Sequence, residues 1–371
     1  MKTFLSILCL GLILSCNSKK STPAIQSGGI SFYVGSYTNK DSKGIYKYTL
    51  NSEGFFSEIG LQTLAENPSF LSFSADKKHL IAANKLDPKP GSISSFTIEG
   101  DSLILNNIMP SGGMNPCFVT TIKDNYVLAA NYGSGNVSLL HLDQNGNLSD
   151  TLSVQQHTGK GTTSRQEGPH AHAVYSVPNS DDIISVDLGT NSLWFYNIDK
   201  NTNTLNLSTP DTLAMEEGAG PRHLTFHPNN KWIYVLNELN NTVTKIERLA
   251  TGQYEKKEST KTLPSDFTAS STSADIHISS DGLFLYTSNR GHNSIAVFKV
   301  SPKDGSLTMA GHEPTRGETP RNFSLSPDEK FVVVANRNSD NLVSYKRNKE
   351  TGILTFVDEI KSPTPSFILF Q

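Results

Sequence analysis

A pattern that recurs seven times constrains the fold of this 371-residue chain more than any other feature. Each copy opens with a small or polar residue, usually followed by Pro, and continues through a short apolar alternation, a polar turn and a second apolar run. The copies begin at Asn67, Asn115, Gly168, Gly220, Ser273, Thr319 and Thr364. A repeat of about 50 residues is the signature of a solenoid or propeller, in which each repeat is one structural unit.

The predicted turns that follow the apolar runs give a second, independent count of seven. Every apolar run is followed by a further strand-like segment and then by a cluster of Gly, Asn, Asp and Ser, residues that favour hairpin turns. These clusters lie at 51–54, 99–102, 143–146, 199–203, 250–253, 301–305 and 348–352. Because the apolar runs are short, β-branched and alternating, each repeat is expected to supply four strands.

The last copy is truncated, and this truncation predicts how the ring closes. Residues 31–37 have the pattern of a second strand with no first strand before them, and residues 364–371 form a first strand with nothing after it. Pairing the two completes one blade and removes the exposed sheet edges. The sequence therefore predicts an all-β fold: a seven-bladed β-propeller over residues 30–371, closed by its N- and C-terminal strands. A charged fraction of only 18% also disfavours an α-rich fold.

The N-terminus is typical of an export signal. Residues 1–15 combine Lys2 with an apolar stretch too short to span a bilayer, and a small residue precedes Cys16. This arrangement resembles a bacterial lipobox, which implies cleavage before Cys16 and lipidation of that cysteine. Residues 16–29 then form a polar tether. We expect an exported lipoprotein, on the periplasmic side, that meets the membrane only through this anchor.

The repeat register predicts a polar cluster at one mouth of the central channel. The first strand of each blade lines the axis, and its start lies beside the end of the antiparallel second strand. Charged and imidazole side chains gather at these positions: Glu167, His170, His172, Arg222, Glu238, Asp275, His277, Arg290, Arg321 and Arg337. Buried cations require an anionic partner, which is either these carboxylates, in an ion-pair network that plugs the channel, or a bound ligand.

The segments GPHAHAV, GPRHLTFHP, YVLNE, TSNR and TPRNFSLSP, in this order, resemble the seven-bladed propeller lactonase family, which includes 6-phosphogluconolactonase-like enzymes and lactonizing enzymes. The resemblance runs from about Phe32 to Gln371. It implies that the catalytic groups are Arg222, Glu238, Arg290 and a histidine of the pair His170 and His172. The remaining members, Glu167, Asp275, His277, Arg321 and Arg337, are expected to bind substrate.

The expected activity is that of a carboxylic-ester hydrolase acting on a sugar lactone. Such a reaction needs a base for water, either Glu238 or a histidine, and a donor for the oxyanion, either Arg222 or Arg290. We expect no metal or other cofactor, because a cationic mouth opposes a divalent ion. Two alternatives remain open: a lactonizing cycloisomerase at the same site, and a non-catalytic propeller that binds an anionic glycan or a protein. With a net charge of −3, the chain has no overall positive electrostatic potential that would attract nucleic acid.

Overall fold

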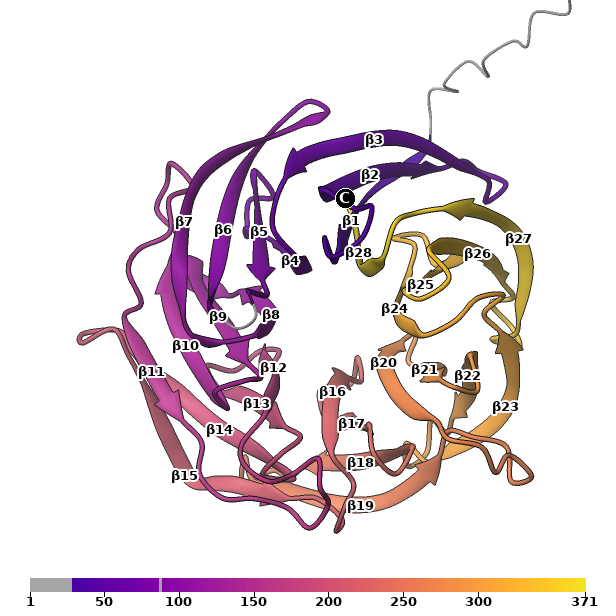
Figure 1. Ribbon diagram of the computed structural model, residues 1–371. Coiled ribbons are helices and arrows are strands. Elements are labelled where there is room, and N and C mark those ends of the chain that lie inside the picture. Colours follow the sequence, from indigo (N-terminus) through magenta and orange to yellow (C-terminus); the bar gives the residue numbers. More distant parts are fainter. Residues whose placement is uncertain (1–28, 87–88) are drawn as a thin grey trace, which may run out of the picture.

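The structure, a computed structural model, describes residues 29–86 and 89–371. These residues form seven four-stranded antiparallel sheets arranged around a central axis (Figure 1). The predicted seven-bladed β-propeller is confirmed. The predicted signal peptide, Cys16 and nearly all of the tether lie outside the described residues.

The strands of each blade occupy four concentric positions. The innermost strands are β28 (Pro365–Phe370), β4 (Pro68–Phe73), β8 (Pro116–Thr121), β12 (Ala171–Ser176), β16 (Pro221–Phe226), β20 (Thr272–Ile278) and β24 (Pro320–Leu325). The second strands are β1 (Ile30–Ser36), β5 (His79–Asn84), β9 (Tyr126–Asn131), β13 (Ile183–Asp187), β17 (Trp232–Asn237), β21 (Phe284–Arg290) and β25 (Phe331–Asn336). The third strands are β2 (Gly44–Leu50), β6 (Pro90–Glu99), β10 (Asn136–His141), β14 (Ser192–Asp199), β18 (Thr242–Arg248), β22 (Ser294–Val300) and β26 (Asn341–Arg347). The outer strands are β3 (Phe56–Leu64), β7 (Ser102–Met114), β11 (Ser153–Gln156), β15 (Thr204–Ala214), β19 (Tyr254–Lys261), β23 (Leu307–Pro314) and β27 (Leu354–Lys361).

The ring closes as the truncated repeat predicts. Strand β28 pairs antiparallel with β1, with Phe32 opposite Phe370 and Val34 opposite Ile368. The closing blade then packs on its neighbour through an aromatic and aliphatic cluster that includes Phe32, Tyr48 and Val333. Closure pairs the strand edges of the two chain ends and buries them.

Packing between the blades explains the composition of the repeats. The second strands are buried on both faces and are therefore mainly apolar before their terminal Asn, whereas the outer strands are half-buried or exposed. In four blades a glycine of the predicted hairpin packs closely against the preceding blade. Gly305 has a φ of 72°, and a Cβ there would lie 2.5 Å from the indole of Trp232 in the preceding blade. Glycine therefore serves both the turn and the close approach.

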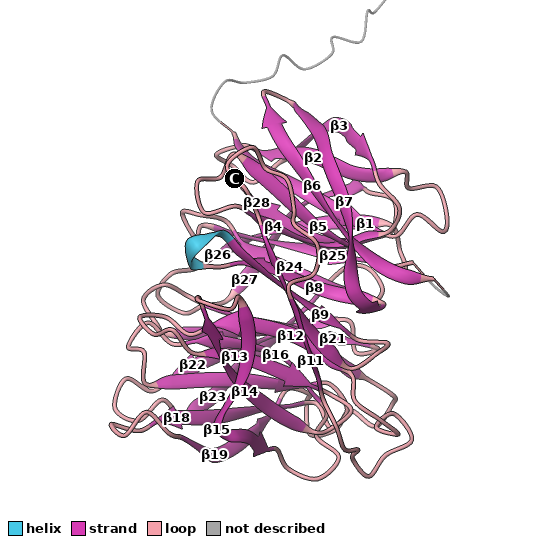
Figure 2. Ribbon diagram, turned by 90° about the vertical axis from the view of Figure 1, so that its left-hand side faces the viewer, coloured by secondary structure: helices cyan, strands magenta, loops and turns pink. Residues whose placement is uncertain are grey.

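Helical structure is confined to one short turn within the described residues. This 3₁₀ turn spans Lys123–Asn125 and is visible in the side view of Figure 2. In the same part of the chain, no helix has the length and apolar character needed to cross a membrane.

Candidate active site

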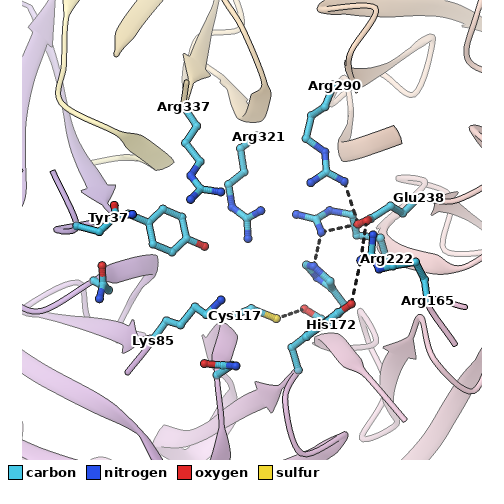
Figure 3. A pocket seen from close by; sticks show the side chains of 14 residues that line it. Tyr37, Lys85, Cys117, Arg165, His172, Arg222, Glu238, Arg290, Arg321 and Arg337 are labelled. Carbon is cyan, nitrogen blue, oxygen red and sulfur yellow. Dashed lines mark hydrogen bonds and ion pairs between the residues drawn. The ribbon is translucent and has the colours of Figure 1, made fainter. Parts of the chain in front are cut away.

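A cavity of about 390 Å³ opens at the mouth of the channel where the inner strands begin (Figure 3). Its lining comes from the starts of inner strands, from residues at or just beyond the ends of second strands, and from loops between blades. The lining residues are Tyr37, Asn39, Asn67, Lys85, Asn115, Cys117, Tyr132, Arg165, His172, Arg222, Glu238, Arg290, Arg321 and Arg337. Six of these side chains are cationic, and Glu238 is the one carboxylate among the described lining residues.

Each inner strand has a β-bulge near its start, and in four of them, β8, β12, β16 and β24, the bulge turns one side chain toward this cavity. In β16 the pairing jumps from Pro221 to His223, which leaves Arg222 unpaired in the ladder. The same shift leaves Arg321 unpaired in β24 and Cys117 unpaired in β8. Bulges of this kind redirect side chains next to functional sites.

The bulge corrects the expected register of the third blade. Counting from Pro169 places His170 in the position of Arg222, but this register is wrong by two residues. Ala171 lies opposite Asp187 just as Pro221 lies opposite Asn237, and the shift then skips His172. His172 is therefore the structural equivalent of Arg222. A similar correction applies to the fifth blade, where Asp275 is shifted one residue deeper, into the layer of His223.

Glu238 is the anionic centre of the cavity. Its Oε2 lies 2.8 Å from Nη1 of Arg222 and 3.0 Å from Nη2 of Arg290, and its Oε1 lies 3.3 Å from Nη2 of Arg165. Burial alone would raise the pKa of Glu238, but the three guanidinium groups outweigh it and lower that pKa to about 2. The carboxylate is thus ionised at neutral pH and holds three arginines in place.

His172 is a neutral imidazole at the floor of the cavity. Burial, and then the neighbouring Arg222, lower the pKa of His172 well below its ordinary value. Nη1 of Arg222 donates to Nε2 of His172. Since an arginine only donates, Nε2 carries the lone pair and Nδ1 carries the hydrogen. That Nδ1 is buried and has no hydrogen-bond partner among the described residues.

Two further arginines face the cavity without a carboxylate. Arg321 and Arg337 form no ion pair within residues 29–86 and 89–371. Their guanidinium groups lie over the ring of Tyr37, at 5.5 and 4.3 Å from its centroid. Burial would raise the pKa of Tyr37, but the two arginines lower it. The ion-pair network around Glu238 therefore accounts for Arg165, Arg222 and Arg290. The charges of Arg321 and Arg337 are not neutralised by it, so the cavity has an excess of positive charge.

Four residues of the predicted cluster do not line the cavity. The side chain of Glu167 is 69% exposed and pairs with His170 at 3.4 Å. His170 stacks behind Tyr132 and contacts the carbonyl of that residue through Nδ1. Asp275 and His277 form a hydrogen-bonded pair deeper in the channel. The structure thus brings together His172, Arg222, Glu238, Arg290, Arg321 and Arg337.

Several lining residues were outside the predicted set, although their repeat positions contained a signal. Tyr37, Lys85 and Tyr132 directly follow second strands, as Glu238 and Arg337 do. Asn67 and Asn115 are the first residues of their repeats, where each has a positive φ before Pro. Arg165 reaches in from the long loop between β11 and β12, and no repeat position marks it.

Comparison with known proteins shows the family to which this chain belongs. The family described as "Lactonase, 7-bladed beta-propeller" matches residues 31–370. The chain belongs to the seven-bladed β-propeller lactonase family. One lactonase relative, the 6-phosphogluconolactonase of Bacillus subtilis (strain 168), is 36% identical over 344 residues, or 91% of this chain and 97% of that protein. A 6-phosphogluconolactonase of Formosa agariphila is 34% identical over 316 residues, or 79% of this chain and 85% of the relative.

A solved structure agrees with the lactonase assignment. The periplasmic gluconolactonase of Pseudomonas aeruginosa superimposes with a TM-score of 0.87 at 27% identity, covering 92% of this chain and 99% of that one. The shared propeller therefore extends over essentially the whole described ring.

Proposed function

We propose that this protein hydrolyses a sugar lactone that carries an anionic group, in the manner of a 6-phosphogluconolactonase. One observation carries the proposal: the cavity of a lactonase-family propeller holds six cations around one buried carboxylate. Opening a lactone passes through a tetrahedral oxyanion, and fixed cationic donors in a shielded site stabilise that charge. The names of the relatives from Bacillus subtilis and Formosa agariphila support the same chemistry.

In this proposal His172 is the base and Arg222 is the oxyanion donor. A carboxyl group with a pKa of about 2 is a weak base, and the oxygens of Glu238 are engaged by three arginines. His172 is neutral, and its Nε2 accepts a hydrogen bond from Arg222, so the Nε2 lone pair becomes available to water when Arg222 donates to the oxyanion instead. An anionic substrate adds negative charge near His172, which raises the pKa of the imidazole and makes it a stronger base. Glu238 then acts as a positioning residue for Arg222 and Arg290.

The deciding experiment is an assay of glucono-δ-lactone and its 6-phosphate, run at mildly acidic pH to limit spontaneous opening. The proposal expects turnover of at least one lactone well above the uncatalysed rate, with higher kcat/KM for the phosphate. A lactone that carries a carboxylate extends the panel. Absence of turnover throughout the panel would contradict the assignment.

Arg337→Gln tests the site of the anionic group. Hydrogen bonds to charged groups contribute about 1.5–3 kcal/mol, so kcat/KM for the phosphorylated lactone is expected to fall about 10- to 100-fold. The uncharged lactone should be affected far less. Arg316→Gln is the matched control, because the guanidinium of Arg316 also lies over an aromatic ring, 3.9 Å from the centroid of Phe356, but outside the cavity. Equal losses for both lactones would place the anion elsewhere.

Export is a separate part of the proposal: the chain is held at the membrane by lipid on Cys16. The lipobox-like segment supports it, and so does the similarity to the periplasmic gluconolactonase of Pseudomonas aeruginosa. Cells fed labelled palmitate should incorporate label into the unmodified protein and not into a Cys16→Ser variant. Recovery of the unlabelled, full-length protein from the cytoplasm would contradict export.

A further inference from the structure

The third blade, β12 to β15, has an apolar residue where the other blades supply a polar side chain to the cavity. In the other blades, the lining residues at or just beyond the end of the second strand are Tyr37, Lys85, Tyr132, Glu238, Arg290 and Arg337. In the third blade this residue is Leu188, which is fully buried and does not line the cavity. The wall between Tyr132 and Glu238 is therefore completed from elsewhere in the chain.

Arg165 fills this gap. Its Nη2 donates to the hydroxyl of Tyr132 in the second blade at 3.0 Å and lies 3.3 Å from Oε1 of Glu238 in the fourth. Arg165 belongs to the loop 157–170, between β11 and β12, and its side chain is 52% exposed. A long, exposed side chain loses much conformational entropy when it is held in one position. A loop that is itself fixed makes this contact less costly.

Asp187 holds both ends of the loop. Its Oδ2 accepts from Nδ1 of His157 at 2.5 Å, and its Oδ1 accepts from the backbone N of His170 at 2.9 Å. The side chains of His157 and Asp187 are fully buried. Five other blades have Asn at the position of Asp187, and the amide of Asn also donates. A carboxylate only accepts, which suits the two donors at the ends of the loop.

Gln166 holds the middle of the loop, directly beside Arg165. Its side chain is fully buried, and its Nε2 donates to the carbonyl oxygen of Leu188 at 2.9 Å and to Oδ1 of Asn191 at 3.1 Å. Its Oε1 accepts from N and Oγ1 of Thr163 at 3.3 and 3.2 Å. Both donor hydrogens and the acceptor of the amide are thus partnered. These bonds attach the loop to the third blade at the residue that leaves the gap.

The same network reaches the backbone of Glu238. Oδ1 of Asn191 also accepts from the backbone N of Gly220, at 2.9 Å. The carbonyl oxygen of Gly220 accepts in turn from the backbone N of Glu238, at 2.7 Å. Gln166 therefore fixes the loop that carries Arg165 relative to the carboxylate that Arg165 contacts.

We propose that Gln166 is a positioning residue: it fixes Arg165 in the place of the polar side chain that the third blade lacks, and Arg165 then holds Oε1 of Glu238. The effect on turnover rests on the proposed lactonase function. Arg222 and Arg290 contact Oε2, whereas Arg165 contacts Oε1. Without Arg165, the carboxylate is held on one side only, and the two arginines on Oε2 are held less firmly.

The tether has a test that does not depend on activity. In Gln166→Leu, the side chain loses its hydrogen bonds to Thr163, Leu188 and Asn191. Hydrogen exchange of the backbone amides in the loop 157–170 should therefore become about tenfold faster or more. Exchange in the strands of the other blades should not change. Equal protection of the loop in the variant and the unmodified protein would overturn the role of Gln166.

Gln155→Leu is the matched control. Gln155 is half-buried, and its Nε2 donates to the carbonyl oxygen of Leu205 at 2.5 Å, also across the boundary between two blades. Gln155 does not line the cavity. This variant should leave both the exchange of the loop 157–170 and the turnover of lactone unchanged.

The kinetic test is a double-mutant cycle. Gln166→Leu and Arg165→Gln should each lower kcat/KM about tenfold. Glucono-δ-lactone and its 6-phosphate should be affected alike, because Arg165 lies beside Glu238 and away from Arg337 (Figure 3). In the double variant the loss should equal that of Arg165→Gln alone, since Gln166 acts through Arg165. Additive losses would overturn the positioning role, because a merely structural defect would add to the loss of Arg165.

Thr163→Val is a milder variant that leaves the bonds of Gln166 to the third blade in place. It removes one of the two hydrogen bonds to Oε1 of Gln166 and the bond from the backbone N of Arg165 to Oγ1. We expect kcat/KM to fall about 2- to 5-fold, and to change no further in the Arg165→Gln background. The cycle is completed with Thr163→Val if Gln166→Leu does not fold, and equal losses with and without Arg165 would again overturn the role.

The outcomes separate the two proposals. Lactone turnover with additive losses in the cycle overturns the positioning role and leaves the lactonase function intact. Absence of lactone turnover in the unmodified protein overturns the function, and hydrogen exchange then decides alone whether Gln166 holds the loop.

Discussion

Replacing Glu238 with Gln is expected to lower kcat/KM on the preferred lactone by about 10²–10³-fold. The amide keeps the shape of the side chain but removes the charge that holds Arg165, Arg222 and Arg290. Without this charge the guanidinium groups repel one another, and Arg222 loses its fixed position. Steady-state kinetics on the lactone panel measure the effect.

The matched control is Glu167→Gln, the same substitution on an exposed carboxylate whose one ion pair within the described part of the chain is with His170. This variant should retain normal turnover. Unchanged turnover in Glu238→Gln, or equal losses in both variants, would contradict the role given to Glu238.

The Glu238 substitution should also lower stability, by about 3 kcal/mol at neutral pH, because removing one partner of a buried ion pair leaves the other charge unpaired. The pKa of this carboxyl falls from 4.5 to about 2 on folding. Its contribution to stability is therefore present above pH 4.5 and is lost as the pH falls toward 2. Urea unfolding should show the difference between the two proteins shrinking over that range. A difference independent of pH would contradict the assigned pKa.

Replacing His172 with Gln is expected to lower kcat by about 10²–10⁴-fold, the usual contribution of a general base. Among the described residues that line the cavity, His172 has the one neutral imidazole. Glutamine cannot accept a proton from water at neutral pH. Far-UV circular dichroism and thermal unfolding should show that the propeller still forms, because the bulge at this position belongs to the backbone of β12.

His170→Gln is the matched control for His172. The two histidines are two residues apart, but His170 stacks behind Tyr132 and does not line the cavity. Its replacement should change kcat only a few-fold, through the position of Tyr132. A larger loss in His170→Gln than in His172→Gln would reverse the assignment that the strand register supports.

Much of this architecture was predictable because its signals are local. Hairpin residues such as those at 301–305, and buried runs such as 331–336, specify turns and strands within a few residues of chain. The truncated copy at Thr364 then allowed only one way to close the ring. The charged positions at or just after the ends of the second strands identified Glu238, Arg290 and Arg337 as neighbours, although they lie far apart in the chain.

The layer that each side chain occupies was not predictable. Counting from Pro169 aligned His170 with Arg222 but left the choice between His170 and His172 open, and counting in the fifth blade placed Asp275 beside Arg222. Each bulge inserts one unpaired residue, and a shift of one residue turns a side chain to the other face of a strand. The local sequence does not reveal the position of the bulge, because that position depends on the hydrogen-bond register with the neighbouring strand.

The sequence by itself determined seven blades, their closure and a cationic channel mouth, since these follow from repeated local patterns and from charge. Only the tertiary structure decided that His172 rather than His170 reaches the cavity, that Glu238 is shared by three arginines, and that His223 and Asp275 lie beneath them. These relations depend on hydrogen-bond register and on distances across the axis, which arise only when separate blades meet.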